Sequence, residues 1–131
     1  MTRFYVKSAA LGDEAVVEVN VYKSRKAMQR AAKVFNGFKP DPDAVGLCQS
    51  YDIDGNTYPI VRLTRDHLGS SVVSHELHHA STAIYGAHVG KKVKARKLLH
   101  HANEPFAYLY SDLFAMTVDL LHTHGYYQED K

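Results

Sequence analysis

The hydrophobic period changes along this chain of 131 residues, and that change limits the folds it can adopt. In residues 14–23, "EAVVEVNVYK", apolar and polar side chains alternate, which predicts a strand with one buried face. Residues 70–85 and 104–124 instead repeat their apolar side chains at helical spacing. Strand patterns lie mostly in the first half and helical patterns mostly in the second, which predicts an α+β fold.

Turn and capping signals predict the remaining elements. Strands are predicted at residues 3–7, 45–53 and 57–65, and a further helix at residues 25–35. Ser24 can cap that helix and Gly37 can end it. Asp54-Gly55 signals a tight turn, so the last two strands should form a hairpin, and Pro59 favours an edge position for the second of them. We therefore expect a small mixed or antiparallel sheet packed against three helices.

The length and the cysteine count limit the domain organisation and the compartment. We expect one domain over residues 1–131, which is long enough to bury a core without disulfides. Cys48 is the only cysteine; it is typical of a reducing compartment, and we interpret it as a small buried strand residue. Because no apolar stretch is long enough for a signal peptide or a membrane span, we expect a cytoplasmic protein without a membrane segment.

The segment "HELHH", residues 75–79, matches the pattern H-E-x-x-H. With nine histidines and five glutamates in the chain, random order would produce this pattern roughly 0.02 times, so chance is a poor explanation. Residues four apart on a helix point the same way, so His75 and His79 can share one zinc ion. Glu76 would then lie where it can take a proton from a water on the metal.

The helical pattern around the motif also indicates a function for Glu76. The apolar side chains of this helix fill one broad arc, and Glu76 projects inside that arc. A carboxylate that faces the core needs a compensating partner, such as a water held by a metal. His75 and His79 lie at the border of the arc, whereas His78 points away from them and is interpreted as a surface residue or a neighbour of the site.

A catalytic zinc site usually has three protein ligands, so we expect the chain to supply one more. Glu104, in the first turn of the last helix, is the preferred candidate, and His100 and His101 are alternatives. Small residues follow Glu104 along one side of this helix: Ala107, Ser111 and Ala115. Small side chains let two helices approach closely, so we expect this helix to be central. The simpler interpretation of Glu104 is a carboxylate that the dipole favours at a helix N-terminus.

Two other side chains of the last helix could serve the same site. Asp112 could accept a hydrogen bond from a ligand histidine, and Tyr108 could donate one to an oxyanion. We favour the simpler interpretations, which are a surface carboxylate for Asp112 and a core aromatic residue for Tyr108.

The motif His75-Glu76-x-x-His79, followed by Glu104, resembles the gluzincin branch of zinc metallopeptidases, which includes thermolysin-like enzymes and very small zincin domains of bacteria and phages. The resemblance covers residues 60–119 and implies a zincin-like fold. It implies that His75, His79 and Glu104 bind Zn²⁺ and that Glu76 is the general base. It also implies that a strand before the motif helix can bind an extended peptide by strand addition.

The resemblance predicts a zinc-dependent peptidase that hydrolyses an intracellular protein or peptide. Family members often carry an acid where this chain has Tyr108. The alternative is a zincin-fold binding module with a structural or vestigial metal site and a protein or nucleic-acid partner. The run "KKVKARK", from Lys91 to Lys97, could contact nucleic acid, although a solvated surface is the simpler interpretation. The intact Glu76 favours the peptidase, because a structural site does not need that carboxylate.

Overall fold

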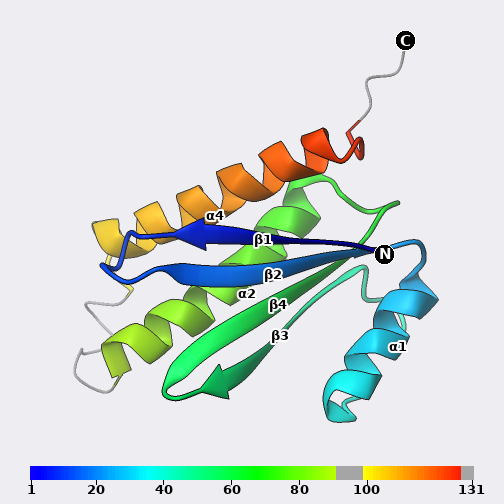
Figure 1. Ribbon diagram of the computed structural model, residues 1–131, viewed down its shortest axis with the longest axis horizontal. Coiled ribbons are helices and arrows are strands. Elements are labelled where there is room, and N and C mark those ends of the chain that lie inside the picture. Colours follow the sequence, from blue (N-terminus) through cyan, green and yellow to red (C-terminus); the bar gives the residue numbers. More distant parts are fainter. Residues whose placement is uncertain (91–98, 128–131) are drawn as a thin grey trace.

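The computed structural model describes residues 1–90 and 99–127, which form a four-stranded sheet and three helices (Figure 1). The strands are β1 (Thr2–Ser8), β2 (Ala15–Tyr22), β3 (Gly46–Ile53) and β4 (Asn56–Thr64), and the helices are α1 (Arg25–Asn36), α2 (Ser70–Val89) and α4 (Glu104–Thr123). The α+β class is confirmed. So are the Ser24 cap of α1, the left-handed Gly37 at its end, and the hairpin turn at Asp54 and Gly55. No helix in these two ranges is long and apolar enough to cross a membrane.

The sheet is mixed and has the strand order β1-β2-β4-β3. β1 pairs with β2 and β3 pairs with β4 in antiparallel fashion, whereas β2 and β4 are parallel. The edge position predicted for the Pro59 strand is therefore wrong, because β4 is internal and β3 is the edge strand. Pro59 is tolerated there because the parallel pairing of β4 with β2 begins one residue later, at Ile60.

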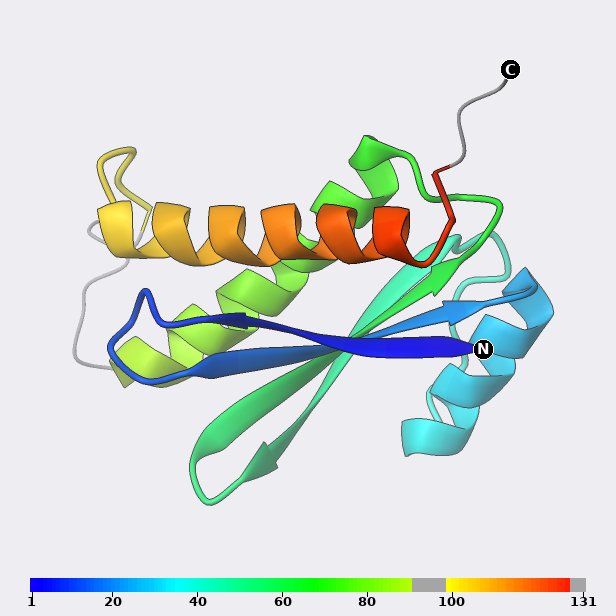
Figure 2. The same cartoon turned by 45° about the horizontal axis from the view of Figure 1, so that its top comes forward.

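Helices cover both faces of the sheet, but unequally. α2 and α4 lie on one face and α1 lies at one end of the other face, as Figure 2 shows. Gln49 of β3 donates a hydrogen bond to the Ala32 carbonyl of α1 over 3.0 Å. The Arg62 guanidinium of β4 lies 5.5 Å from the centre of the Phe35 ring. Gln49 and Arg62 therefore point to the α1 face of the sheet. Their neighbours along each strand point to the opposite face, where they pack against α2 and α4.

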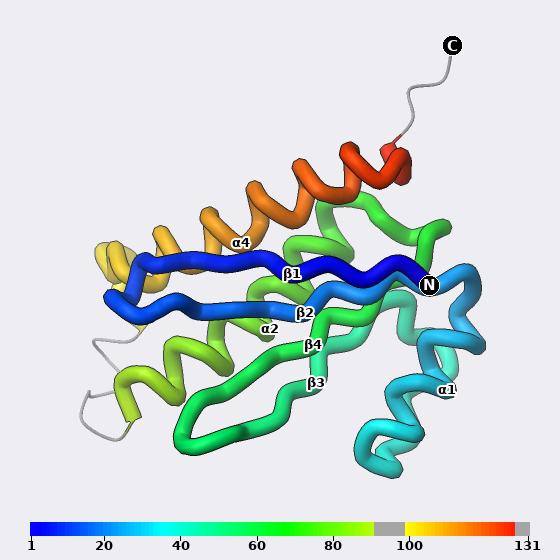
Figure 3. Tube along the Cα trace, viewed as in Figure 1, coloured from blue at the N-terminus to red at the C-terminus, as the bar shows by residue number. Residues whose placement is uncertain are grey.

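α4 is a peripheral helix, contrary to the prediction that it would be central. Figure 3 shows it running along the outside of β1 and across α2. The buried residues of α4 form a single stripe: Leu109, Leu113, Thr117 and Leu121. The small residues of the opposite side are exposed: Ala107, Ser111 and Ala115. Thr117 can occupy the core because its hydroxyl donates to the Leu113 carbonyl over 2.7 Å, which satisfies its polar group.

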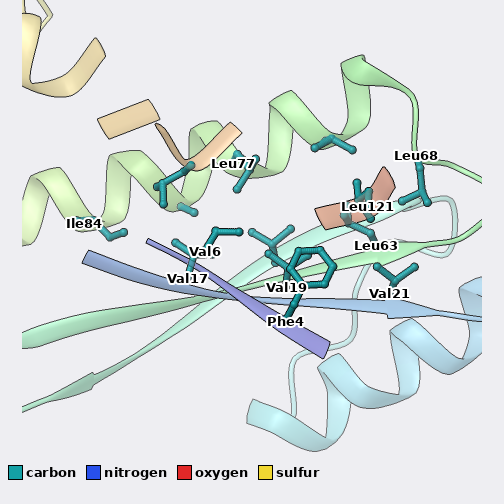
Figure 4. Packing of buried hydrophobic residues seen from close by; sticks show 14 of the residues in the cluster. Phe4, Val6, Val17, Val19, Val21, Leu63, Leu68, Leu77, Ile84 and Leu121 are labelled. Carbon is teal, nitrogen blue, oxygen red and sulfur yellow. The ribbon is translucent and has the colours of Figure 1, made fainter. Parts of the chain in front are cut away.

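The main core lies between the sheet and the pair α2 and α4 (Figure 4). The β2 residues Val17, Val19 and Val21 point into it, as their alternation predicted, and are at most 1% exposed. Leu77 of α2 packs against them and is fully buried. Complete burial of such a side chain stabilises the fold by about 1.5–3 kcal/mol. This packing fixes which side of α2 faces the sheet.

Candidate metal centre

α2 presents the H-E-x-x-H motif on its side nearest the edge strand β3. Val73, Leu77, Ala80 and Ile84 are buried against the sheet and set the rotation of the helix. With that rotation, Glu76 turns toward β3 and is only 6% exposed. His75 and His79 fall at the outer border of the buried arc and are exposed. This is the arrangement that the helical pattern of the sequence predicted.

The two histidines lie at a distance that suits a shared metal ion. Their Nε2 atoms are 3.2 Å apart. Two nitrogens that each lie about 2.0–2.1 Å from a tetrahedral zinc ion would be roughly 3.3 Å apart. Within residues 1–90 and 99–127, the ligand atoms of His75, Glu76 and His79 form a group in which all lie within 4.8 Å of one another. The donor set, two imidazoles and a carboxylate, also suits zinc.

Glu76 is a buried residue whose carboxylate oxygens still reach solvent, since no buried polar side-chain atom of the described residues lacks a partner. In the described part of the chain, no side chain or backbone group donates a hydrogen bond to its carboxylate. Burial raises the pKa of the Glu76 carboxyl, and the nearby His75 lowers it by a smaller amount. Burial also lowers the pKa of His79, and His75 and His78 lower it further. A neutral imidazole is the form that binds a metal, and a raised carboxyl pKa makes the carboxylate a better proton acceptor.

Gly46 of β3 allows the Glu76 side chain to lie against the sheet edge. A Cβ atom at position 46 would come within 2.9 Å of Glu76 Cγ and 3.0 Å of Glu76 Oε2. Cys48, two residues along the same strand, packs against the core as a strand residue, but it is half-buried rather than buried as predicted. Burial, with a smaller contribution from the Glu76 charge, raises the pKa of the Cys48 thiol to about 12. The sequence alone assigned no role to Gly46, because only the fold brings it to Glu76.

Two hollows flank the histidine pair. The first, of about 450 Å³, lies between α2 and β3 and is lined by residues 46–50 together with His75, Glu76, His79 and Ala83. The second, of about 340 Å³, is lined by α2 residues and by Tyr110 of α4. There the hydroxyls of Ser74 and Tyr110 form a 2.5 Å hydrogen bond. The histidine pair is thus reachable from two sides, and Glu76 lines the first hollow.

The aromatic residue beside the histidine pair is Tyr110, not Tyr108. Tyr108 is 61% exposed on α4, so its interpretation as a core residue is wrong. Tyr110 lines the second hollow together with both histidines, and the sequence pattern did not single it out. The ring of His78 contacts the rings of Phe106 and Tyr110, at centroid distances of 5.8 and 6.1 Å. His78 therefore turns toward α4 and away from the pair.

The structure does not bring Glu104 to the histidine pair. Glu104 is the first residue of α4, is exposed, and lies outside the group of ligand atoms around His75. It follows the cap residue Asn103, where the helix dipole favours a carboxylate. His100 and His101 are also exposed and outside that group, and their rings stack on each other with centroids 4.4 Å apart. The physical reason is the rotation of α4, which turns its small-residue side to solvent.

Asp112 has a structural partner. Its carboxylate accepts a 2.7 Å hydrogen bond from the Ser8 hydroxyl and so connects α4 to β1, which agrees with the simpler interpretation of this residue. The basic run from Lys91 to Lys97 lies outside the described residues.

Comparisons of the chain with protein-family models, with curated proteins and with solved structures find no match. The gluzincin resemblance therefore depends on the motif residues alone.

Proposed function

We propose that this chain is a zinc-dependent peptidase with a zincin-like fold, in which His75 and His79 hold the metal and Glu76 is the general base. The observation that supports the proposal most is the burial of Glu76. The residue is only 6% exposed, and its partial desolvation disfavours the charged carboxylate, as the raised pKa indicates. Its position beside two histidines at metal-sharing distance gives a functional reason for that desolvation. Zinc, when bound, would supply Lewis acidity toward a water molecule and a substrate carbonyl.

Glu76 moves the proton in the proposed reaction. Burial makes its carboxylate a stronger base, so it accepts a proton from the attacking water. The resulting acid then donates that proton to the leaving amine. Both transfers take place in the hollow between α2 and β3, where the carboxylate is accessible.

The substrate of the proposed peptidase is an extended protein segment. β3 is an edge strand, and residues 46–50 of it line the hollow beside Glu76. An extended segment can pair with such an edge by backbone hydrogen bonds, which would place its carbonyl groups next to the histidines. The strand-addition site implied by the family resemblance is therefore assigned to β3 rather than to β4.

A comparison of substitutions tests the mechanism. Wild type with zinc is expected to hydrolyse an unfolded protein such as casein, and a chelator should stop the reaction. Glu76→Gln should bind zinc with unchanged affinity and lose hydrolysis by about 10²–10⁴-fold. Asp119→Asn is the matched control, because Asp119 is exposed and lies outside both hollows. Hydrolysis that persists in Glu76→Gln would contradict the mechanism.

Zinc titration tests the ligand set. His75→Ala and His79→Ala should each abolish binding, since these are the two imidazoles of the one group in the described ranges whose ligand atoms could share an ion. A site with fewer than three protein ligands should bind zinc more weakly than an ordinary catalytic site. Glu104→Ala tests whether Glu104 is the third protein ligand. Unchanged zinc affinity would exclude Glu104, whereas a clear loss of affinity would identify it as a ligand.

A binding module with a structural or vestigial metal site is the second candidate. It is favoured by one observation, which is that Glu104 lies away from the histidine pair. Such a module would bind zinc without hydrolysing any protein tested, and Glu76→Gln would alter neither property. The casein assay and the zinc titration together distinguish the two candidates.

A further inference from the structure

The sheet is split at one end, between β2 and β4. The two strands begin at Ala15 and Asn56, but their parallel pairing starts only at Glu18 and Ile60. Before that point, β2 pairs with β1 on its outer side and β4 pairs with β3 on its outer side. The inner edges of residues 15–17 and 56–59 therefore face each other without a strand between them. Figure 1 shows the two strands diverging at this end.

A cavity of about 420 Å³ opens in this split. The last turns of α2 contribute Ile84, Ala87 and His88 to it, and the walls come from the start of β2 and from residues 55–58 of the β3–β4 hairpin. Its volume lies within the range of about 300–1,000 Å³ that is usual for ligand sites. No residue of the His75–Glu76–His79 group lines it, so it is a separate site from the candidate metal centre.

The titratable side chains that line the cavity are two carboxylates and one histidine, His88. Asp13 and Glu14, which precede β2, both line it and are both exposed. Lys7 forms an ion pair with Glu14, at 3.6 Å between Nζ and Oε1. α2 ends at Val89, so its C-terminal carbonyl groups and the negative end of its dipole lie at the same cavity. These charges favour a cationic ligand.

We propose that this split binds an extended basic peptide segment, which adds as a strand to the inner edges of β2 and β4. Free strand edges recognise the backbone of an extended peptide through alternating N–H and C=O groups. Lysine or arginine side chains on that peptide would lie beside Asp13 and Glu14, whereas acidic side chains would be repelled. The proposal does not depend on the peptidase function, because it uses neither the histidines nor β3.

The test is a titration of ¹⁵N-labelled full-length protein with the peptide acetyl-Val-Lys-Val-Lys-Val-Lys-amide. Saturable changes of amide chemical shift are expected in residues 15–17 and 56–58; Pro59 has no amide hydrogen and gives no signal. The same peptide with glutamate in place of lysine should not bind. A version N-methylated at alternate residues should not bind either, because it cannot pair with a strand edge. The double variant Asp13→Asn, Glu14→Gln should weaken binding by about three- to tenfold, and Asp119→Asn on α4 is the control.

Three outcomes would overturn the proposal. The first is the absence of saturable shifts at about 1 mM peptide, which corresponds to the weakest affinity of interest. The second is equal binding of the lysine and glutamate peptides, which would remove the charge argument. The third is a set of shifts confined to residues 46–50, which would place the peptide on β3. The third outcome would leave the proposed peptidase standing, and inactivity of the wild type toward casein would leave this proposal standing.

Discussion

Replacing Gly46 by alanine is expected to displace Glu76 from its position against β3. The new Cβ would lie 2.9 Å from Glu76 Cγ, and 3.0 Å from both Glu76 Oε2 and Val72 Cγ1. Carbon atoms in favourable contact lie about 3.5–4.0 Å apart, so these groups would have to separate by roughly 0.5–1 Å. Gly46 does not have a positive φ angle, so its backbone accepts alanine and the effect is steric.

The overlap sets the magnitude of the effect on stability. Overpacking of a well-packed site costs about 1–3 kcal/mol. Alanine recovers about 0.5–1 kcal/mol, because glycine loses more backbone entropy on folding. The net decrease in the free energy of unfolding is therefore about 0–2.5 kcal/mol, which corresponds to a decrease in Tm of up to about 10 °C for a domain of this size.

Thermal unfolding of the metal-free protein, followed by circular dichroism, measures this change. Gly86→Ala is the matched control, because Gly86 lies within α2 and a Cβ there would meet nothing within 4 Å. That substitution should stabilise the protein by up to about 1 kcal/mol through helix propensity. If Gly46→Ala lowers the free energy of unfolding and Gly86→Ala raises it, the steric effect at position 46 is distinguished from the entropic effect of replacing glycine.

A double-mutant cycle identifies the group that the new methyl group meets. Glu76→Ala removes Cγ and the carboxylate and leaves only the contact with Val72. The cost of Gly46→Ala should therefore be smaller in the Glu76→Ala background, by on the order of 1 kcal/mol. Equal costs in the two backgrounds would refute the claim that Gly46 positions Glu76.

Two further substitutions test the burial of Glu76 and the role of Asp112. In metal-free protein, Glu76→Gln should raise Tm at neutral pH, because the amide avoids the desolvation that raises the pKa of the carboxyl. A folded-state pKa above the ordinary value stabilises wild type at low pH, and this stabilisation is lost as pH rises through that pKa. The Tm difference should thus widen from about pH 4 to about pH 7, and a constant difference would contradict the assignment. Asp112→Asn should cost about 1 kcal/mol through the bond to Ser8 and leave zinc affinity unchanged, whereas weaker zinc binding would indicate contact with a ligand histidine.

Most elements could be predicted because their signals depend on residues that are close in sequence. The Ser24 side chain accepts from the Ala27 N–H, and Gly37 adopts the left-handed conformation that ends α1. The i and i+4 spacing of His75 and His79 likewise requires only a helix. Their proximity is confirmed, and metal binding stays a prediction.

Features that depend on packing between distant segments could not be predicted. The contact between Gly46 and Glu76 requires the register of β3 against α2, which no local pattern contains. On α4, the apolar residue Met116 is 38% exposed, whereas the neighbouring polar residue Thr117 is buried. A threonine that satisfies its own hydroxyl within the helix is not distinguishable in the sequence from a surface threonine.

The rotation of α4 about its axis determines where Glu104 lies. Two movements could bring Glu104 to the metal, and they differ in free-energy cost. Turning α4 about its axis would remove Leu109, Leu113 and Leu121 from the core, at a cost of about 4.5–9 kcal/mol for three leucines. One ligand of a four-ligand zinc site accounts for only roughly 2.5–4 kcal/mol of the total. Unwinding the first turn of α4 would instead sacrifice the Asn103 cap, which is worth about 1 kcal/mol. A contribution of Glu104 to zinc binding would therefore require local unwinding of this turn, and zinc should then speed hydrogen exchange at the Phe106 amide that Asn103 caps.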